Sequence, residues 1–177
     1  DYIYVSGSVV PGVSGVEQLL QAFDAAGLSS LKIVYSGRLN GDWASEVFFS
    51  KPYVINMGAL SPEQSLVVAK KSIAMFAFYK PINLNYIYAS PNKVSDALML
   101  AKPLLINSEC EAKHLVIDAG LALCSPYEDV SSLVANLYLL VSGGFVVSIE
   151  KSDSVFRNNF SENSIKLNWK KVLINHE

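Results

Sequence analysis

Short apolar runs of strand length alternate with amphipathic segments along the whole chain. The run at 73–78 is apolar at every position, as expected for a central strand that is covered on both faces. Alternating strands and helices favour a parallel sheet with helices on both sides, so we predict an α/β, Rossmann-like fold of about six strands. Strands are predicted for the runs at 2–6, 31–35, 53–56, 73–78, 103–106 and 121–123.

Helices are predicted where apolar residues recur at helical spacing and where capping residues occur. Residues 16–23 place their apolar side chains on one helix face, and Gly27 follows as a stop. Ser61, a proline in the first turn and Gln64 form a helix-start signature, and this helix should end near Lys71. Other helices are expected after Asp42 with Val47, Phe48 and Phe49, from Ser90-Pro91-Asn92 to before Lys102-Pro103, at 129–141, and through 152–175 around Trp169.

The composition is that of one globular domain. With 177 residues, 51% of them hydrophobic, the chain can bury a substantial core. A net charge of -2 and a pI near 5.7 offer no general attraction for a polyanion, so no nucleic-acid partner is expected. The apolar stretch 133–147 is interrupted by polar residues and glycines, and it is shorter than the roughly 20 residues that a membrane-spanning helix needs.

Two cysteines and a cluster of three lysines are relevant to the cellular location of the protein. Cys110 and Cys124 have neither CxxC spacing nor a histidine cluster beside them. Neither a disulfide nor a metal site is therefore favoured, and we expect reduced thiols in a cytoplasmic protein. We interpret Lys166, Lys170 and Lys171 as a solvated helix face. The alternative is peripheral association of the full-length protein with the inner face of the plasma membrane.

Two predicted loops at the carboxyl ends of strands have the chemistry of a binding site. In a parallel sheet, ligands bind in the crevice beyond these ends. Residues 7–15 contain three glycines, which let the backbone approach a phosphate at a helix start, although turn geometry alone explains them equally well. Ser36-Gly37-Arg38 ends a strand with a guanidinium that suits a diphosphate, and a solvated surface arginine fits as well.

A third loop, 79–96, is strongly polar for so apolar a chain. Its segment 90–93, Ser-Pro-Asn-Lys, offers free N–H groups at a helix start with one ammonium beside them, which are the components of a diphosphate site. Asp96 follows one turn later and can accept hydrogen bonds from two ribose hydroxyls. In the alternative interpretation, Ser90 only caps the helix and Asp96 pairs with Lys93 on the surface.

Residues 85–108 read NYIYASPNKVSDALMLAKPLLINS. This stretch resembles the donor-site signature of GT-B glycosyltransferases of the glycogen-synthase-like, family-4-like superfamily. In that signature a Pro-Asn-Lys turn is followed by an acid, an Ala- or Met-rich helix, Lys-Pro and a strand. The opening glycine loop and the segment 56–63 fall in the family's order as well.

The resemblance implies that residues 1–177 are the C-terminal, nucleotide-sugar-binding domain of a glycosyltransferase whose N-terminal acceptor domain is absent from the chain. The start at Asp1, without an initiator Met, agrees with an excised fragment. The resemblance further implies that Asp96 binds the donor ribose, that Asn92 and Lys93 approach the diphosphate or the sugar, and that no cofactor or metal is obligatory. The donor-binding residues implied are Gly12, Arg38, Gly58, Leu60, Asn85, Tyr88, Ser90, Pro91, Asn92, Lys93 and Asp96.

The implied activity is hexosyl transfer, with retention, from a nucleoside-diphosphate sugar to a saccharide or lipid-linked acceptor in surface polysaccharide synthesis. The catalytic base is expected in the N-terminal half, so this domain alone should bind donor without transferring it. One departure is visible: Tyr88 and Asp96 stand where the family has two glutamates with seven residues between them. The departure leaves hexose recognition open.

Two other interpretations remain open from the sequence. The first is a non-catalytic α/β module that docks other proteins, an interpretation that the missing first glutamate supports. The second is a flavodoxin-like or response-regulator domain. It ranks last, because the chain lacks the acidic cluster after the first strand that phosphoacceptor sites need.

Overall fold

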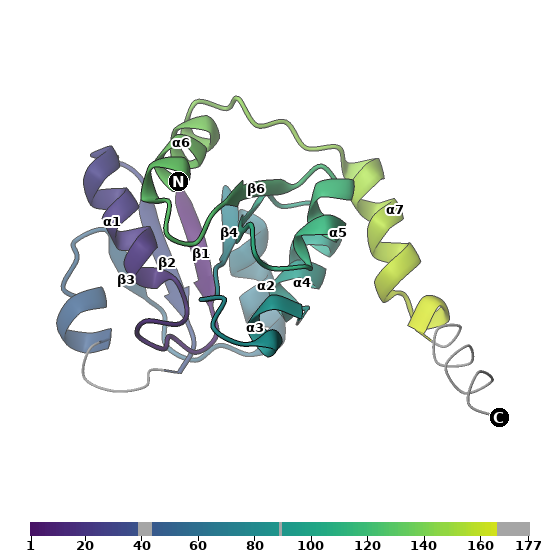
Figure 1. Cartoon of the computed structure of the whole chain (residues 1–177), viewed down its shortest axis with the longest axis horizontal. Coiled ribbons are helices and arrows are strands. Elements are labelled where there is room, and N and C mark those ends of the chain that lie inside the picture. The colour runs from purple at the N-terminus through teal and green to yellow at the C-terminus, as the bar shows by residue number, and fades with distance from the viewer. Residues whose placement is uncertain (39–43, 89, 166–177) are drawn as a thin grey trace.

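The computed structural model describes residues 1–38, 44–88 and 90–165. In this part of the chain, six parallel strands form one sheet in the order β3-β2-β1-β4-β5-β6 (Figure 1). The predicted Rossmann-like α/β fold is therefore confirmed. The order reverses between β1 and β4, and ligands of such sheets bind at this reversal. The strands are β1 (Tyr2–Ser6), β2 (Lys32–Ser36), β3 (Val54–Asn56), β4 (Ala74–Ala77), β5 (Leu104–Asn107) and β6 (Ala122–Ser125).

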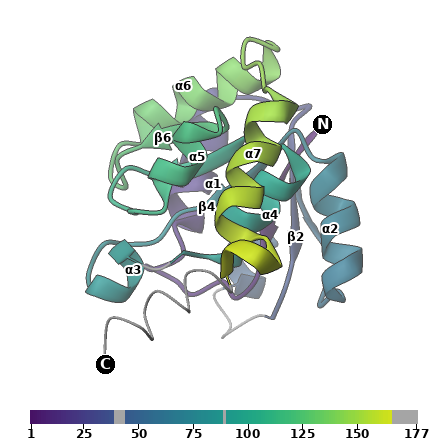
Figure 2. The ribbon, with the colours of Figure 1, turned by 90° about the vertical axis from the view of Figure 1, so that its right-hand side faces the viewer.

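Helices cover both faces of the sheet. They are α1 (Val16–Ala26), α2 (Pro62–Lys71), α3 (Leu84–Tyr88), α4 (Asn92–Leu100), α5 (Lys113–Asp118), α6 (Val130–Val141), α7 (Ile149–Phe160) and a π-helical turn, η1 (Ala44–Phe48). α1 and α6 pack together on one face, whereas α2, α4 and α5 cover the other, with α7 against α4 and α5 (Figure 2). None of the helices described is long and apolar enough to span a membrane.

The sheet is buried on both faces, and this burial explains its apolar sequence. In β1, Ile3 and Val5 enter the core beneath α1 and α6, whereas Tyr4 enters the core beneath α2 and α4. All four residues of β4 are buried, as are all four of β5. A strand with two covered faces has no solvent-facing side, which is why its segment is mostly apolar and lacks the usual alternation; Asn107, at the end of β5, is a buried polar exception.

Three predicted helix boundaries are confirmed by their capping contacts. The Gln64 backbone N–H donates to Ser61 Oγ at 3.3 Å, and the Ser61 N–H donates to Gln64 Oε1 at 3.0 Å, so α2 begins with a complete capping box. Gly27 ends α1 in the left-handed conformation at φ 61°. Asp129 caps α6 by accepting from the Ser132 N–H at 3.0 Å.

Other boundaries differ from the sequence prediction. α4 begins at Asn92 after an extended Pro91 and has no side-chain cap, so Ser90 as the cap is wrong. α3 lies in a segment predicted as a loop, and α5 was not predicted, because helices of five and six residues are too short to show an apolar period. The tail helix α7 begins three residues before the predicted start at 152. The predicted cap Asp42 and the segment 166–175 lie outside the described residues.

Candidate functional site

A cavity of about 710 Å³ opens at the carboxyl edge of the sheet, beside the reversal between β1 and β4. The loop after β1, the first turns of α2, the residues after β4 and the start of α4 form its walls. Five of the residues that the resemblance implied, 90–93 and Asp96, line this cavity. The full lining is Ser6, Gly7, Ser8, Pro62, Ser65, Leu66, Tyr79, Ser90, Pro91, Asn92, Lys93, Ser95 and Asp96.

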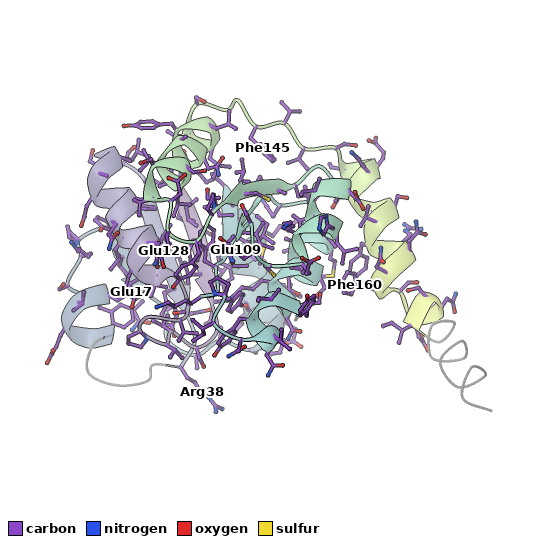
Figure 3. The ribbon with its side chains drawn as sticks, viewed as in Figure 1. Glu17, Arg38, Glu109, Glu128, Phe145 and Phe160 are labelled. Carbon is purple, nitrogen blue, oxygen red and sulfur yellow. The ribbon has the colours of Figure 1, made fainter. Side chains whose placement is uncertain are left out.

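A second cavity of about 350 Å³ adjoins the first and shares Ser65 and the loop after β1 with it. The remaining wall comes from the ends of β2 and of the segment after β3, and it includes Arg38 and Leu60 from the predicted set. Its own residues are Ser36, Gly37, Arg38, Ala59 and Leu60. Figure 3 shows Arg38 at the edge of the molecule with its side chain directed away from the ribbon.

Hydrogen bonds centred on the buried Tyr4 side chain connect β1, β2 and α2 beneath the two cavities. The hydroxyl of Tyr4 on β1 is shared with Ser36 Oγ and, at 2.7 Å, with Ser65 Oγ on α2. Tyr4 is 1% exposed, so this network is held in the core rather than in solvent. Ser65, which lines both cavities, is thereby linked to β1 directly and to β2 through Tyr4.

A second buried tyrosine ties together the loops that line the cavities. The Tyr35 hydroxyl shares its one proton between two carbonyl acceptors, Gly7 O at 2.9 Å and Arg38 O at 3.0 Å. Burial raises the pKa of Tyr35 to about 12, so the hydroxyl remains a donor throughout the neutral range. Backbone hydrogen bonds from Gly7 to Ser36 and from Gly37 to Gly58 continue the sheet beyond the strand ends.

Lys93 places an ammonium at the start of α4. Its Nζ donates to the Tyr79 hydroxyl at 2.9 Å and lies 5.1 Å from the centroid of the Tyr79 ring. The Tyr79 N–H donates to Asn107 Oδ1 at 2.9 Å, and the Asn107 side chain donates in turn to Glu109 at 3.0 Å. Among the described residues Lys93 has no carboxylate partner, so its charge is available to a ligand.

Asp96 lines the same cavity one turn further along α4. Burial raises the pKa of its carboxyl, and no hydrogen bond or ion pair joins it to another described residue. The alternative interpretation, in which Asp96 pairs with Lys93, is therefore wrong. A half-buried carboxylate without a protein partner can accept hydrogen bonds from a ligand that carries hydroxyls.

Four of the implied residues lie outside these two cavities. Gly12 is exposed, and its N–H donates to Glu17 Oε1 at 2.6 Å. Gly58 turns the chain at φ 68° and accepts from Gly37, so it supports the second cavity without lining it. Tyr88 is 67% exposed at the end of α3. The fourth, Asn85, lines a separate recess of about 250 Å³ near Pro91. The donor-binding role of the implied set stays a prediction.

Several lining residues were not singled out from the sequence. Ser6 ends β1 and Ser8 follows it, Ser65 lies in the first turn of α2, and Tyr79 lies two residues after β4. Their position after strands or at a helix start was the available signal. Within the described part of the chain, no three His, Cys, Asp or Glu side chains come together as ligands for a metal ion. His114 lies on α5, outside the cavities, and its Nε2 is 3.6 Å from Glu111 Oε2.

Comparisons with known proteins identify the fold. No protein-family model matches the sequence, and no curated protein shows significant similarity to it. Among solved structures, the lipopolysaccharide outer core galactosyltransferase WaaB superposes with a TM-score of 0.76 at 13% identity, over 99% of this chain and 49% of WaaB. Anabaena HepE, in complex with UDP-glucose, gives 0.76 at 12% identity over 99% and 49% of the two chains.

A third structure matches over most of both chains. The C-terminal domain of the group 1 glycosyl transferase LpcC from Francisella tularensis gives a TM-score of 0.66 at 9% identity, over 93% of this chain and 86% of that domain. This chain therefore spans about half the length of WaaB and HepE and nearly the length of one isolated half. The six-stranded parallel sheet with helices on both faces is the fold of one half of a GT-B glycosyltransferase.

Proposed function

We propose that this chain is the C-terminal, donor-binding domain of a GT-B glycosyltransferase and that the cavity beside β1 and β4 binds a nucleoside-diphosphate sugar. One observation carries the proposal: an ammonium and a carboxylate, both without a charged partner among the described residues, line one cavity at the start of one helix. The Lys93 ammonium can bind the phosphate groups of a nucleotide, and the Asp96 carboxylate can accept hydrogen bonds from its ribose hydroxyls.

The start of α4 supplies positive potential for the diphosphate. The first hydrogen bond of this helix runs from the Val94 N–H to Pro91 O at 2.8 Å, so the N–H groups of Asn92 and Lys93 precede it and face the helix end. An anion at such an end gains about 0.3–1 kcal/mol from the helix dipole, before the charge of Lys93 is added. The chain's own groups supply this charge, and we propose no obligatory metal.

Asp96 is proposed to accept hydrogen bonds from the two ribose hydroxyls. The hydroxyls would stabilise the ionised carboxylate, and hydrogen bonding to the charged form lowers a pKa that burial has raised. At pH values near the pKa of Asp96, donor binding should therefore release protons. The same linkage predicts tighter binding above that pKa than below it.

In this proposal the domain holds the donor and stabilises the departing diphosphate through α4 and Lys93. The acceptor site and the catalytic base belong to the other half of the enzyme, so the chain alone binds donor without efficient transfer. We propose hexosyl transfer with retention to a saccharide or lipid-linked acceptor, in surface polysaccharide synthesis. The likeness to WaaB, a lipopolysaccharide galactosyltransferase, supports this last point through fold alone.

The test is calorimetric titration of the 177-residue chain with UDP, GDP and dTDP. Saturable binding of at least one of them is expected, and Asp96→Asn should weaken it by about 10- to 150-fold, because a good charge-assisted hydrogen bond contributes about 1.5–3 kcal/mol. Asp118→Asn is the matched control, because Asp118 is an exposed carboxylate on α5 outside the cavities. Absence of saturable binding, or equal affinities for the two variants, would refute the proposal and favour the docking module.

A further inference from the structure

A carbon-lined recess of about 250 Å³ lies beside the donor cavity. It shares Tyr79 and Pro91 with that cavity, and Asn85 and Tyr86 on α3 complete it. The rings of Tyr79 and Tyr86 are nearly parallel, at 8° and with 6.3 Å between their centroids. The recess therefore continues the donor cavity toward α3 with aromatic and proline surface.

The backbone of α3 is capped locally at its start and tied to the rest of the domain at its end. At its start, the Tyr86 N–H donates to Asn83 Oδ1 at 3.0 Å. At its end, Ile87 O accepts from the Glu111 N–H at 2.7 Å, which ties α3 to the segment after β5. The Tyr86 ring is thus presented by a held helix and not by a free loop, and a held wall can select one ligand shape over another.

The order of the binding residues along α4 indicates which part of the donor lies next to the recess. Asp96, Lys93 and Pro91 follow one another toward the start of the helix, over about 7.5 Å at 1.5 Å per residue. In the proposed function Asp96 binds the ribose and Lys93 the diphosphate. The glycosyl group follows the diphosphate in the donor, and the recess follows Lys93 toward the start of α4. Pro91 lines one side of the recess, and Tyr79, whose ring contacts Lys93, lines the other.

The recess offers few partners to sugar hydroxyls. No charged side chain is among its four residues, and the Tyr79 hydroxyl already accepts from Lys93. Beyond the recess, α3 continues with large apolar side chains, since Leu84 and Tyr88 are 69% and 67% exposed. The four residues expose almost only carbon in the recess, so a hydroxyl that enters it loses water with few partners in exchange, whereas a methyl group gains apolar contact.

We propose that the glycosyl group of the donor is a 6-deoxy sugar whose methyl group packs in the recess of Tyr79, Asn85, Tyr86 and Pro91. The inference rests on the proposed function, because the recess receives a sugar only if the adjoining cavity holds the diphosphate. Tyr86 is then a specificity-determining residue of the donor site. In a 6-deoxyhexose a methyl group replaces the C6 hydroxymethyl group of the hexose, and the recess is large enough for it.

The test compares nucleotide sugars that differ in a single hydroxyl: UDP-glucose with UDP-6-deoxyglucose, GDP-mannose with GDP-6-deoxymannose, and dTDP-glucose with dTDP-6-deoxyglucose. Binding of each to the 177-residue chain is measured by calorimetry, with the free nucleoside diphosphate as reference. For the nucleotide that binds, the 6-deoxy sugar is expected to bind about tenfold more tightly than its partner, the scale at which an apolar pocket discriminates one small group.

Two substitutions locate the preference in the recess. Tyr86→Ala removes the ring and should bring the ratio of the two affinities close to one, whereas Tyr86→Phe keeps the ring and should keep the ratio. Melting temperatures of both variants check that each is folded. Equal affinity of the two sugars, or a preference that survives Tyr86→Ala, would overturn the inference while leaving nucleotide binding intact. Failure of every free nucleoside diphosphate to bind would instead overturn the proposed function, and the inference with it.

Discussion

Gly37 is the position where the cavity wall tolerates a side chain least. It adopts φ 156°, and a Cβ added there would lie 2.0 Å from Gly7 O and 2.7 Å from the Tyr35 hydroxyl oxygen. The Gly7 carbonyl cannot retreat easily, because it accepts from Tyr35 at 2.9 Å, while the Gly7 N–H donates to Ser36 O at 2.9 Å. Gly37→Ala must therefore separate the loops after β1 and β2 or break the Tyr35 hydrogen bonds.

The expected loss of stability follows from these contacts. Overpacking of a well-packed site costs about 1–3 kcal/mol, and each broken hydrogen bond adds about 0.5–1.5 kcal/mol. For Gly37→Ala we expect the free energy of unfolding to fall by about 3 kcal/mol, which corresponds to a melting temperature lower by about 6–12 °C in a domain of this size. Affinity for the nucleotide should fall too, because Gly7 and Gly37 line the cavities.

The assay is urea unfolding together with thermal melting, and the control is Gly143→Ala. Gly143 has φ 70° with open space around its added Cβ, so that substitution adds only backbone strain of about 1 kcal/mol. Gly37→Ala should lose about 2 kcal/mol more than Gly143→Ala. Equal losses for the two variants would refute the rigid contact between the loops after β1 and β2.

Two further predictions concern the buried groups of the site. Because burial raises the pKa of Asp96 in the folded state, its stability contribution is complete below the unfolded pKa and is lost as pH rises through the folded pKa. Asp96→Asn should therefore raise the melting temperature at pH 7 relative to wild type and have less effect at pH 3; an equal effect at both pH values would contradict this linkage. Tyr35→Phe removes the donor to Gly7 O and Arg38 O, so urea unfolding should show a loss of about 1–3 kcal/mol. A loss no larger than that of Tyr138→Phe, which removes a single hydrogen bond to Ala26 O at a half-exposed site, would argue against the bridging role of Tyr35.

Local signals in the sequence determined the elements and the fold class. The capping box of Ser61 and Gln64 and the stop at Gly27 act within a few residues, so they can be read without the fold. The fully apolar run that became β4 indicated a strand covered on both sides, and alternation of such runs with helices required a parallel sheet. The same reasoning placed the start of α4 at the carboxyl edge of the sheet.

Which side chains share a cavity, and which groups lack a partner among the described residues, depends on contacts between distant parts of the chain. The spacing of Lys93 and Asp96 permits an ion pair on one helix face, yet the ammonium bonds to Tyr79, which arrives from β4. Ser65 reaches the cavity because α2 crosses beside β1, while Tyr88 ends in solvent. The physical reason is that capping and periodicity act over a few residues, whereas strand order and crossover set contacts between residues far apart in the chain.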